Sequence, residues 1–218
     1  RIAMEDGILV PWKKNRPEDT KTAWELMMAD RGGLYLDSKP GLYTDVIELD
    51  FASLFPSIIA TRNISPETLN CACCQPSGET ITNSNLLPLN IELASQEIRR
   101  RHLEERIGTG LFPSINSGAL PVPGLSSHTC GRNHGFLGRV VAPIIERRRE
   151  LKTQILHKGD RFDKQQNALK WLLVTCFGYT GYKNARFGRI EAHEAICAWA
   201  REILLQTIAM AEQAGWTV

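Results

Sequence analysis

The fold is decided by the stretch VIELDFASLFPSII at residues 46–59. Residues 46–51 alternate as a strand does, with three apolar side chains on one side and the carboxylate of Asp50 on the other. Ser53 is a favourable N-cap residue for a short helix over residues 54–59. A strand that delivers a carboxylate and turns at once into a helix N-terminus is a common way to build a phosphate or metal site.

The composition is typical of a folded protein, and it does not indicate which kind of molecule the protein binds. Of 218 residues, 43% are hydrophobic, which is ample for a packed core. Lys and Arg number 26 against 24 Asp and Glu, so net charge neither demands nor excludes a nucleic-acid partner. Basic residues gather in local clusters, which are as a rule solvated helix faces: Arg99–Arg101, Arg147–Arg149, and the looser set Lys183, Arg186 and Arg189.

The sequence carries no sign of a membrane or secreted protein. No stretch is long and apolar enough to cross a bilayer, and the N-terminus has no signal-peptide layout. Six cysteines in a chain of this size do not make a disulfide-dense scaffold. We therefore expect no membrane partner and a reducing, cytoplasmic setting.

Three long helices are predicted in the C-terminal half, over residues 140–157, 163–177 and 191–214. Arg148 and Lys152 lie one turn apart within the apolar face of the first helix, and Lys170 lies on a polar face of the second. These side chains either snorkel out of core helices or present cations to an anionic ligand. Three cations opposite a strand carboxylate would suit a triphosphate with bound Mg²⁺.

Two motifs of this sequence resemble those of family B DNA polymerases. DFASLFPSII at residues 50–59 is similar to the first palm motif, whose usual form is Asp-x-x-Ser-Leu-Tyr-Pro-Ser-Ile. The similarity continues through NISPETL at residues 63–69, in the style of archaeal replicative enzymes. The block at residues 170–186 is similar to the fingers motif. The resemblance covers most of the chain apart from about residues 75–127, and identifies it as a member of this family.

The resemblance implies an α+β fold, in which part of a polymerase palm (an antiparallel sheet with helices) carries a helical-hairpin fingers subdomain. Two shorter helices, over residues 18–29 and 91–107, are expected from the sequence pattern. We expect four segments: the N-terminal part of the palm at 1–74, an irregular insertion at 75–135, the fingers helices at 136–182, and a return to the palm at 183–218.

The resemblance also implies a role for individual residues. Asp50 matches the catalytic palm aspartate that binds two Mg²⁺ ions, with the Phe51 carbonyl as a neighbouring ligand. Two such ions clamp the attacking 3′-oxygen and the leaving pyrophosphate oxygen. The residues that match the nucleotide-binding positions are Ser53, Leu54, Phe55, Arg148, Lys152 and Lys170, and Lys170 is also expected to be catalytic.

Phe55 matches the tyrosine whose ring excludes a 2′-hydroxyl. The residues that match positions contacting DNA are Tyr179, Gly181, Tyr182 and Arg186. The implied activity is DNA-directed DNA synthesis on primer–template DNA from deoxynucleoside triphosphates (dNTPs), in association with the nucleoid.

The sequence departs from the family pattern at several places. Val174 stands where the family usually has Asn, and Phe177 and Phe55 stand where it usually has Tyr. One lost polar contact costs about 1–3 kcal/mol where its partner is left unpaired. A second metal-binding motif, Asp-x-Asp, would follow Val218, so we expect it on a C-terminal segment or a second polypeptide. Asp50 alone should not hold two Mg²⁺ ions, so these 218 residues are not expected to polymerise by themselves.

Two other functions remain open from the sequence. A catalytically impaired polymerase-like module, which binds nucleic acid or assembles with partners, is favoured by Val174, Phe177 and Phe55. A nucleotide-binding protein unrelated to polymerases is a more distant hypothesis, because the sequence has no Gly-rich Walker loop.

The cysteines raise a separate question. Cys71, Cys73 and Cys74 precede the irregular segment, and His128, Cys130 and His134 follow it. Such a set can supply four ligands to a structural Zn²⁺ ion, with Cys71, Cys74, His128 and Cys130 as the candidate ligands. Two alternatives are free thiols and a Cys74–Cys130 disulfide, the pairing that the resemblance to some archaeal relatives implies.

Overall fold

The computed structural model describes residues 2–5, 7, 21–24, 27, 33, 34, 36, 37, 39–74, 118–158, 161–182 and 184–218. Its helices are α1 (Ile2–Glu5), α3 (Leu54–Thr61), α5 (Phe136–Lys158), α6 (Arg161–Gly181) and α7 (Ile190–Gln213), with a 3₁₀ helix at Ala72–Cys74. Two strands, β1 (Ala119–Pro121) and β2 (His128–Cys130), pair antiparallel with Leu120 opposite Thr129. The expected α+β class is confirmed.

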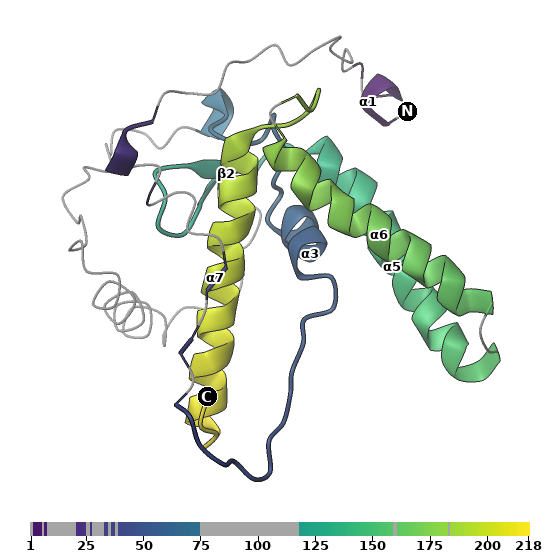
Figure 1. The fold of residues 1–218 in the computed structure, drawn as a ribbon. Helices are drawn as coiled ribbons and strands as arrows, with labels where there is room; N and C mark the ends of the chain where they lie inside the picture. Colours follow the sequence, from purple (N-terminus) through teal and green to yellow (C-terminus); the bar gives the residue numbers. More distant parts are fainter. Residues whose placement is uncertain are drawn as a thin grey trace.

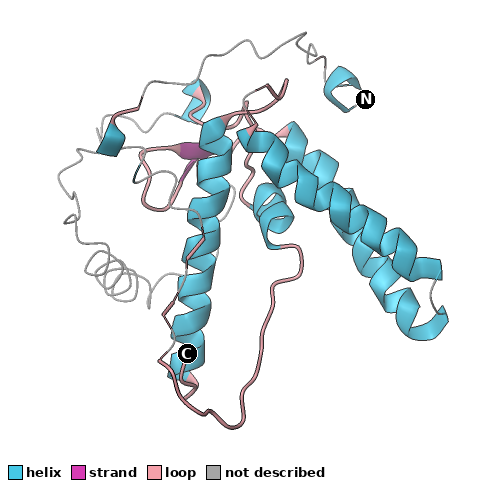
Figure 2. Ribbon diagram, in the orientation of Figure 1, coloured by secondary structure: helices cyan, strands magenta, loops and turns pink. Residues whose placement is uncertain are grey.

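Helices dominate the described part of the chain (Figure 2). All three long helices that the periodicity predicts are present as α5, α6 and α7, and each of the first two is longer than predicted. Figure 1 shows α5 and α6 side by side as a projecting hairpin, with α3 between this hairpin and α7. The helix predicted at 91–107, and most of the one predicted at 18–29, lie outside the described residues. No described helix is both long and apolar enough to span a bilayer.

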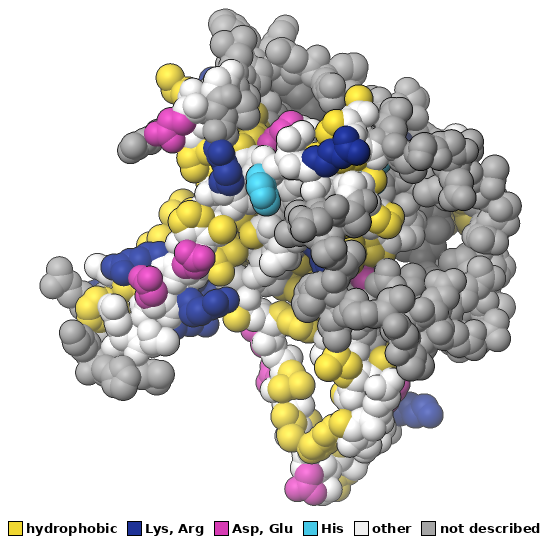
Figure 3. All heavy atoms as spheres, turned by 180° about the vertical axis from the view of Figure 1, so that it is seen from behind, with side chains coloured by type: hydrophobic (Ala, Val, Ile, Leu, Met, Phe, Trp, Pro, Cys, Tyr) yellow, Lys and Arg dark blue, Asp and Glu magenta, His cyan; other side chains and the backbone are white. Residues whose placement is uncertain are grey.

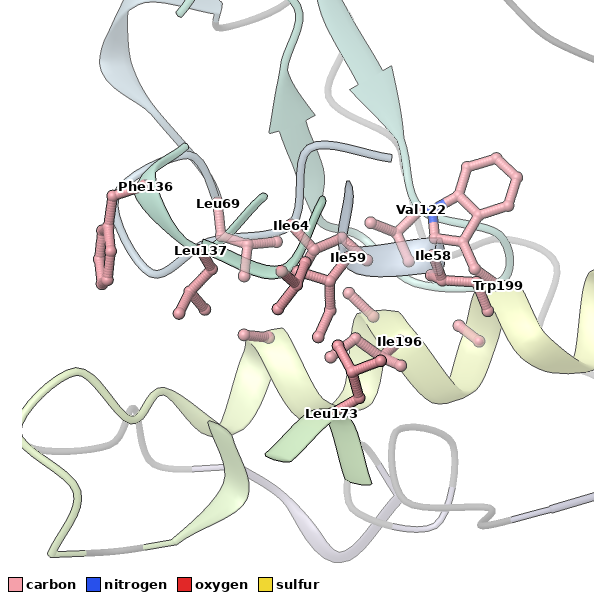
Figure 4. Close-up of a cluster of buried hydrophobic side chains, with 14 residues drawn as sticks. Ile58, Ile59, Ile64, Leu69, Val122, Phe136, Leu137, Leu173, Ile196 and Trp199 are labelled. Carbon is pink, nitrogen blue, oxygen red and sulfur yellow. The ribbon is translucent and has the colours of Figure 1, made fainter. Parts of the chain in front are cut away.

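The core forms where α3 meets the three long helices. Figure 4 shows the α3 side chains Ile58 and Ile59 facing Ile196 of α7. Ile59 and Ile196 are fully buried, and Ile58 is 1% exposed. Burying one such side chain stabilises the fold by about 1.5–3 kcal/mol. The remaining members of this core cluster are Ile64, Leu69, Val122, Phe136, Leu137, Val141, Leu173, Ala192, Ala195, Ala198 and Trp199.

The strand predicted over residues 46–51 is wrong for the described structure. These residues form an exposed loop, in which Val46 is 74% and Leu49 is 78% exposed. Alternation of side chains tells which way they would point in a strand, but the ladder itself needs a neighbouring strand to accept and donate hydrogen bonds. No described strand pairs with this loop. Residues 216–218, at the C-terminus of the chain, are likewise a loop.

The exposed loop extends back before residue 46, and this earlier part also carries large apolar side chains on its surface. Leu42 is 97% exposed and Tyr43 is 60% exposed. Figure 3 shows hydrophobic side chains on the narrow projection at the bottom of the molecule, where Figure 1 draws this loop and the C-terminus. The loop therefore has the side chains of a strand without the sheet that would cover them.

The segment after α3 fastens that helix to the start of α5. Asn63 adopts φ 53°, a left-handed conformation that Asn tolerates better than most residues. Its Nδ2 donates to the carbonyls of Cys130 (2.6 Å) and Asn133 (2.7 Å), and its Oδ1 accepts from the N–H of Gly135 (2.7 Å). One side chain thus satisfies three backbone groups that lie about 70 residues away in the sequence.

The cap of α5 also comes from this segment. The Phe136 N–H donates to Glu67 Oε1 (2.6 Å), and the Leu137 N–H donates to Ser65 Oγ (3.4 Å). Ser65 Oγ in turn donates to Glu67 Oε2 (2.6 Å). The first N–H groups of a helix lack partners within it, so these two side chains satisfy donors that would otherwise be left unpaired. Together, Asn63, Ser65 and Glu67 form what we call the α3–α5 clamp.

Replacing Asn63 with Ala tests the clamp. The change leaves two carbonyls and one N–H without their partner and places Ala in a left-handed conformation. We expect the free energy of unfolding to fall by roughly 2–4 kcal/mol. Urea unfolding monitored by circular dichroism measures it. Asn184→Ala is the matched control, because Asn184 is exposed and its one bond within the described residues goes to the Tyr182 hydroxyl; an equal loss in both variants would contradict the role of the clamp.

Candidate functional site

The start of α3 is tied to the α5–α6 hairpin by a chain of polar side chains. Arg148 Nη1 donates to Ser53 Oγ at 2.6 Å, and Arg148 Nε donates to Gln166 Oε1 at 3.3 Å. Gln166 Nε2 then donates to Asp163 Oδ1 at 2.9 Å. These bonds join α3, α5 and α6 in one network. Gln166 is buried, and the sequence alone does not single it out.

Ser53 occupies the N-cap position of α3, as predicted, but the predicted side-chain cap is wrong. Its φ of 58° and ψ of 47° are left-handed, and its side chain makes no capping hydrogen bond. The hydroxyl instead accepts from Arg148. A serine hydroxyl oxygen can accept only a small number of hydrogen bonds. A hydrogen bond from a charged guanidinium is stronger than one from a neutral backbone N–H. The N–H groups at the start of α3 therefore have no cap from Ser53.

Two of the three predicted cations, both on the α5–α6 hairpin, form no bond with another described residue. Lys152 of α5 and Lys170 of α6 are exposed, and neither ammonium makes a hydrogen bond or ion pair with another described residue. Arg148, by contrast, is half-buried and already bonded. The described part of the hairpin thus offers one guanidinium bonded at the start of α3 and two ammonium groups, on α5 and α6, that no described residue engages.

Asp50 lies on the exposed loop three residues before Ser53. Its carboxylate makes no hydrogen bond or ion pair with a described residue. Phe51, the other expected metal ligand, is 36% exposed. A carboxylate and a carbonyl are the hard oxygen ligands that Mg²⁺ prefers, so both residues fit a divalent cation chemically.

Aromatic rings fill the space beside α3. Phe55 stacks on Phe177 with 4.2 Å between ring centroids, and Phe177 stacks on His193 at the same distance. A cavity of about 370 Å³ lies against this stack and is lined by all three rings, together with Phe51 and Leu54. Phe177, one of the two phenylalanines that stand where the family usually has tyrosine, therefore lies between the rings of Phe55 and His193.

His193 is a residue whose place sequence reasoning missed. Its Nδ1 is buried and has no hydrogen-bond partner among the described residues. A Cβ atom at Gly181 would lie 2.9 Å from this nitrogen, so the position admits only glycine without a shift. Stacking between rings of different helices leaves no mark in a single sequence.

The residues expected to contact DNA lie at the end of α6 and in the turn to α7. Tyr179 is 39% exposed and Tyr182 is 55% exposed, and both hydroxyls accept hydrogen bonds from the turn: Tyr179 from the Phe187 N–H and Tyr182 from Asn184. Arg186 is exposed. The structure brings these residues together on one turn beside the hairpin.

Arg189, which the sequence groups with two other basic residues, has a structural role. Its Nη1 donates to the carbonyls of Pro66 (2.9 Å) and Leu69 (2.8 Å), and its Nε donates to Glu191 (3.1 Å). The guanidinium holds the segment after α3 against the start of α7. Because these bonds already engage the Arg189 guanidinium, it is less available to a phosphate group than the exposed side chain of Arg186.

Four cysteine sulfurs come together beside β2. The sulfur atoms of Cys71, Cys73, Cys74 and Cys130 all lie within 4.8 Å of one another. His128, expected as a ligand beside them, has Nε2 3.8 Å from Cys71 Sγ and 3.3 Å from the Cys71 carbonyl. Cys73, not His128, completes this group of four, and His134 is exposed outside it.

Comparison with known proteins supports the motifs. The family model described as DNA polymerase family B matches residues 1–218. DNA polymerase 2 of Saccharolobus solfataricus is 31% identical over 217 residues, which cover 100% of this chain and 26% of that protein. DNA polymerase 1 of Pyrococcus abyssi is 26% identical and is matched over 100% of this chain and 23% of its own length. The chain spans about a quarter of the length of these relatives.

Proposed function

This chain belongs to DNA polymerase family B, and from that membership we propose that it forms the palm and fingers of a DNA-directed DNA polymerase. The proposed reaction transfers a nucleotide from a dNTP to the 3′-hydroxyl of a primer on template DNA. The Arg148–Ser53 bond carries the proposal, because it ties the proposed fingers hairpin to Ser53, three residues after the proposed palm aspartate Asp50.

We propose that the incoming triphosphate binds between the start of α3 and the α5–α6 hairpin. The N–H groups at a helix start, including that of Leu54, favour an anion. Lys152 and Lys170 would add two positive charges that no described residue neutralises. Arg148 can pass from Ser53 Oγ to a phosphate oxygen with a small movement, and its bond to Gln166 keeps it oriented. Lys170 is the proposed catalytic cation at the leaving group.

Asp50 is the proposed metal-binding carboxylate, with the Phe51 carbonyl beside it. Its exposure and its lack of a bond to any described residue support this role, because a carboxylate already bonded would have to give up that bond. A bound Mg²⁺ would supply charge neutralisation between the attacking and leaving oxygens. The ring of Phe55 is the proposed steric block to a 2′-hydroxyl, since its stacking on Phe177 fixes its position.

The proposed DNA contacts are those of Tyr179, Gly181, Tyr182 and Arg186 on the turn after α6. The proposed boundaries of the palm, insertion and fingers are those stated from the sequence, and α5 and α6 coincide with the fingers segment. An impaired polymerase-like module is the second candidate. Val174 favours it, because this residue is 51% exposed on α6 and cannot form the hydrogen bond of the usual Asn.

Removing the Asp50 carboxylate distinguishes the two candidates. We expect Asp50→Ala to lower primer extension by the complete polypeptide that carries this chain roughly a thousandfold or more, because several kcal/mol of metal-dependent stabilisation are lost. Asp37→Ala, another exposed carboxylate, is the control and should extend normally. Single-turnover extension with Mg²⁺ and one dNTP measures both. Binding of primer–template DNA without extension by the unmodified protein would favour the impaired module.

Replacing Arg148 tests the nucleotide site. The loss of one charged contact of about 1.5–3 kcal/mol should lower the rate constant divided by the dNTP dissociation constant between about ten- and a hundredfold. Arg147→Ala is the matched control, because Arg147 lies one residue away, is exposed and pairs with Glu150. Titration of dNTP in single-turnover extension supplies the values. Equal effects of the two substitutions would show that Arg148 does not hold the nucleotide.

A further inference from the structure

The four cysteines beside β2 are brought together from two separate parts of the chain. Cys71, Cys73 and Cys74 belong to the turn and 3₁₀ helix that follow the α3–α5 clamp, and Cys130 ends β2. Cys74 and Cys130 are 56 residues apart in the sequence, yet their sulfur atoms are 3.6 Å apart. None of the four is in a disulfide.

The sulfur–sulfur distances match the edges of a metal-centred tetrahedron. Cys73 Sγ lies 3.4 Å from Cys71 Sγ, 3.8 Å from Cys74 Sγ and 3.6 Å from Cys130 Sγ. A Zn–S bond of about 2.3 Å in tetrahedral geometry separates the sulfurs by about 3.8 Å. All six separations lie within 4.8 Å, which leaves room for one ion at the centre and none for a cluster of several metals.

We propose that Cys71, Cys73, Cys74 and Cys130 bind one structural Zn²⁺ ion through four thiolates. Four sulfur ligands in a closed tetrahedron are the usual set of a structural zinc site, whereas a catalytic site keeps one position open. Soft sulfur ligands also select zinc against the Mg²⁺ proposed at Asp50. The site is therefore separate from the nucleotide site and does not depend on its chemistry.

Groups around the four sulfurs are placed to favour thiolates. The Asn133 N–H donates to Cys130 Sγ at 3.2 Å, and Asn133 Nδ2 donates to Cys73 Sγ at 3.7 Å. Hydrogen-bond donors around the ligands orient them and stabilise their charge, as is usual in metal sites.

The close packing of the four sulfur atoms itself favours a bound cation: all of them lie within 4.8 Å of one another. Four sulfur atoms packed this closely can ionise together only when a cation neutralises them. His128 Nε2, 3.8 Å from Cys71 Sγ, is then a neighbour that can donate to the thiolate, not a fourth ligand.

The position of the site implies that a bound zinc ion would hold two separate segments of the chain together. The Cys130 carbonyl accepts from Asn63, so one ligand residue is also part of the contact surface of the α3–α5 clamp. The ion would therefore fix β2 to the segment after α3, just before α5 begins. Closing a long loop by metal ligation stabilises the native chain, because the unfolded chain has no preformed site.

Metal analysis of the complete polypeptide, purified under reducing conditions, tests the proposal. We expect one zinc per chain by mass spectrometry of the metal content. Replacement by Co²⁺ should give the visible absorption bands and sulfur-to-cobalt charge-transfer band of a tetrahedral four-sulfur site. We expect Cys73→Ser to lower bound zinc at least about tenfold and to change the Co²⁺ spectrum. Cys176→Ser is the control, because Cys176 lies on α6 outside the group of four.

Three results would overturn the proposal. The first is a zinc-free protein that, when purified without reductant, has an intact mass showing two fewer hydrogens, which would establish a disulfide. The second is iron in place of zinc. The third is full zinc retention in Cys73→Ser together with zinc loss in His128→Ala, which would make His128 the ligand. Titration of the unmodified protein with a mercurial reagent keeps the test valid where a variant does not fold: release of zinc with modification of four thiols is expected, and release without thiol modification contradicts the site.

Discussion

The hydrogen bonds from Asn63, Ser65 and Glu67 to the start of α5 are the constraint on which the rest of the molecule depends. They join the end of α3 to a helix whose first residue lies 69 positions after Glu67 in the sequence. Because Asn63 is left-handed, the chain reverses sharply after α3 and carries Ser65 and Glu67 to the unpaired N–H groups of α5. The relation between the α3 motif and the α5–α6 hairpin is fixed at this junction, and Arg148 reaches Ser53 as a result.

Polar groups near this junction fall into two kinds. Two of them are engaged within the chain: the half-buried Arg189 donates to the carbonyls of Pro66 and Leu69, and the buried Gln166 bonds to both Arg148 and Asp163. Asp50, Lys152 and Lys170 are exposed and bond to no described residue. An enzyme that acts mainly by positioning and charge neutralisation needs this division, because the groups that meet its substrate must not be engaged elsewhere.

The sequence predicts the helices better than it predicts the surfaces between them. Periodicity places α5, α6 and α7 because each helix contains its own hydrogen bonds, and the α+β class follows from the family resemblance. The segment at 46–51 has a strand's alternation and no described partner, so pattern alone could not decide its state. The left-handed Ser53, the Phe55–Phe177–His193 stack and the choice of Cys73 over His128 each depend on distant contacts. Spacing along one chain does not encode such contacts.

The central claim is that Asp50, the start of α3 and the cations of α5 and α6 surround one nucleotide. The most direct measurement is a structure of the complete polypeptide with primer–template DNA, a non-hydrolysable dNTP and Mg²⁺. We expect a metal ion about 2.1 Å from an Asp50 oxygen. We also expect a triphosphate that contacts Leu54, Arg148 and Lys170. A triphosphate bound away from the α5–α6 hairpin, or a metal ion held without Asp50, would contradict it.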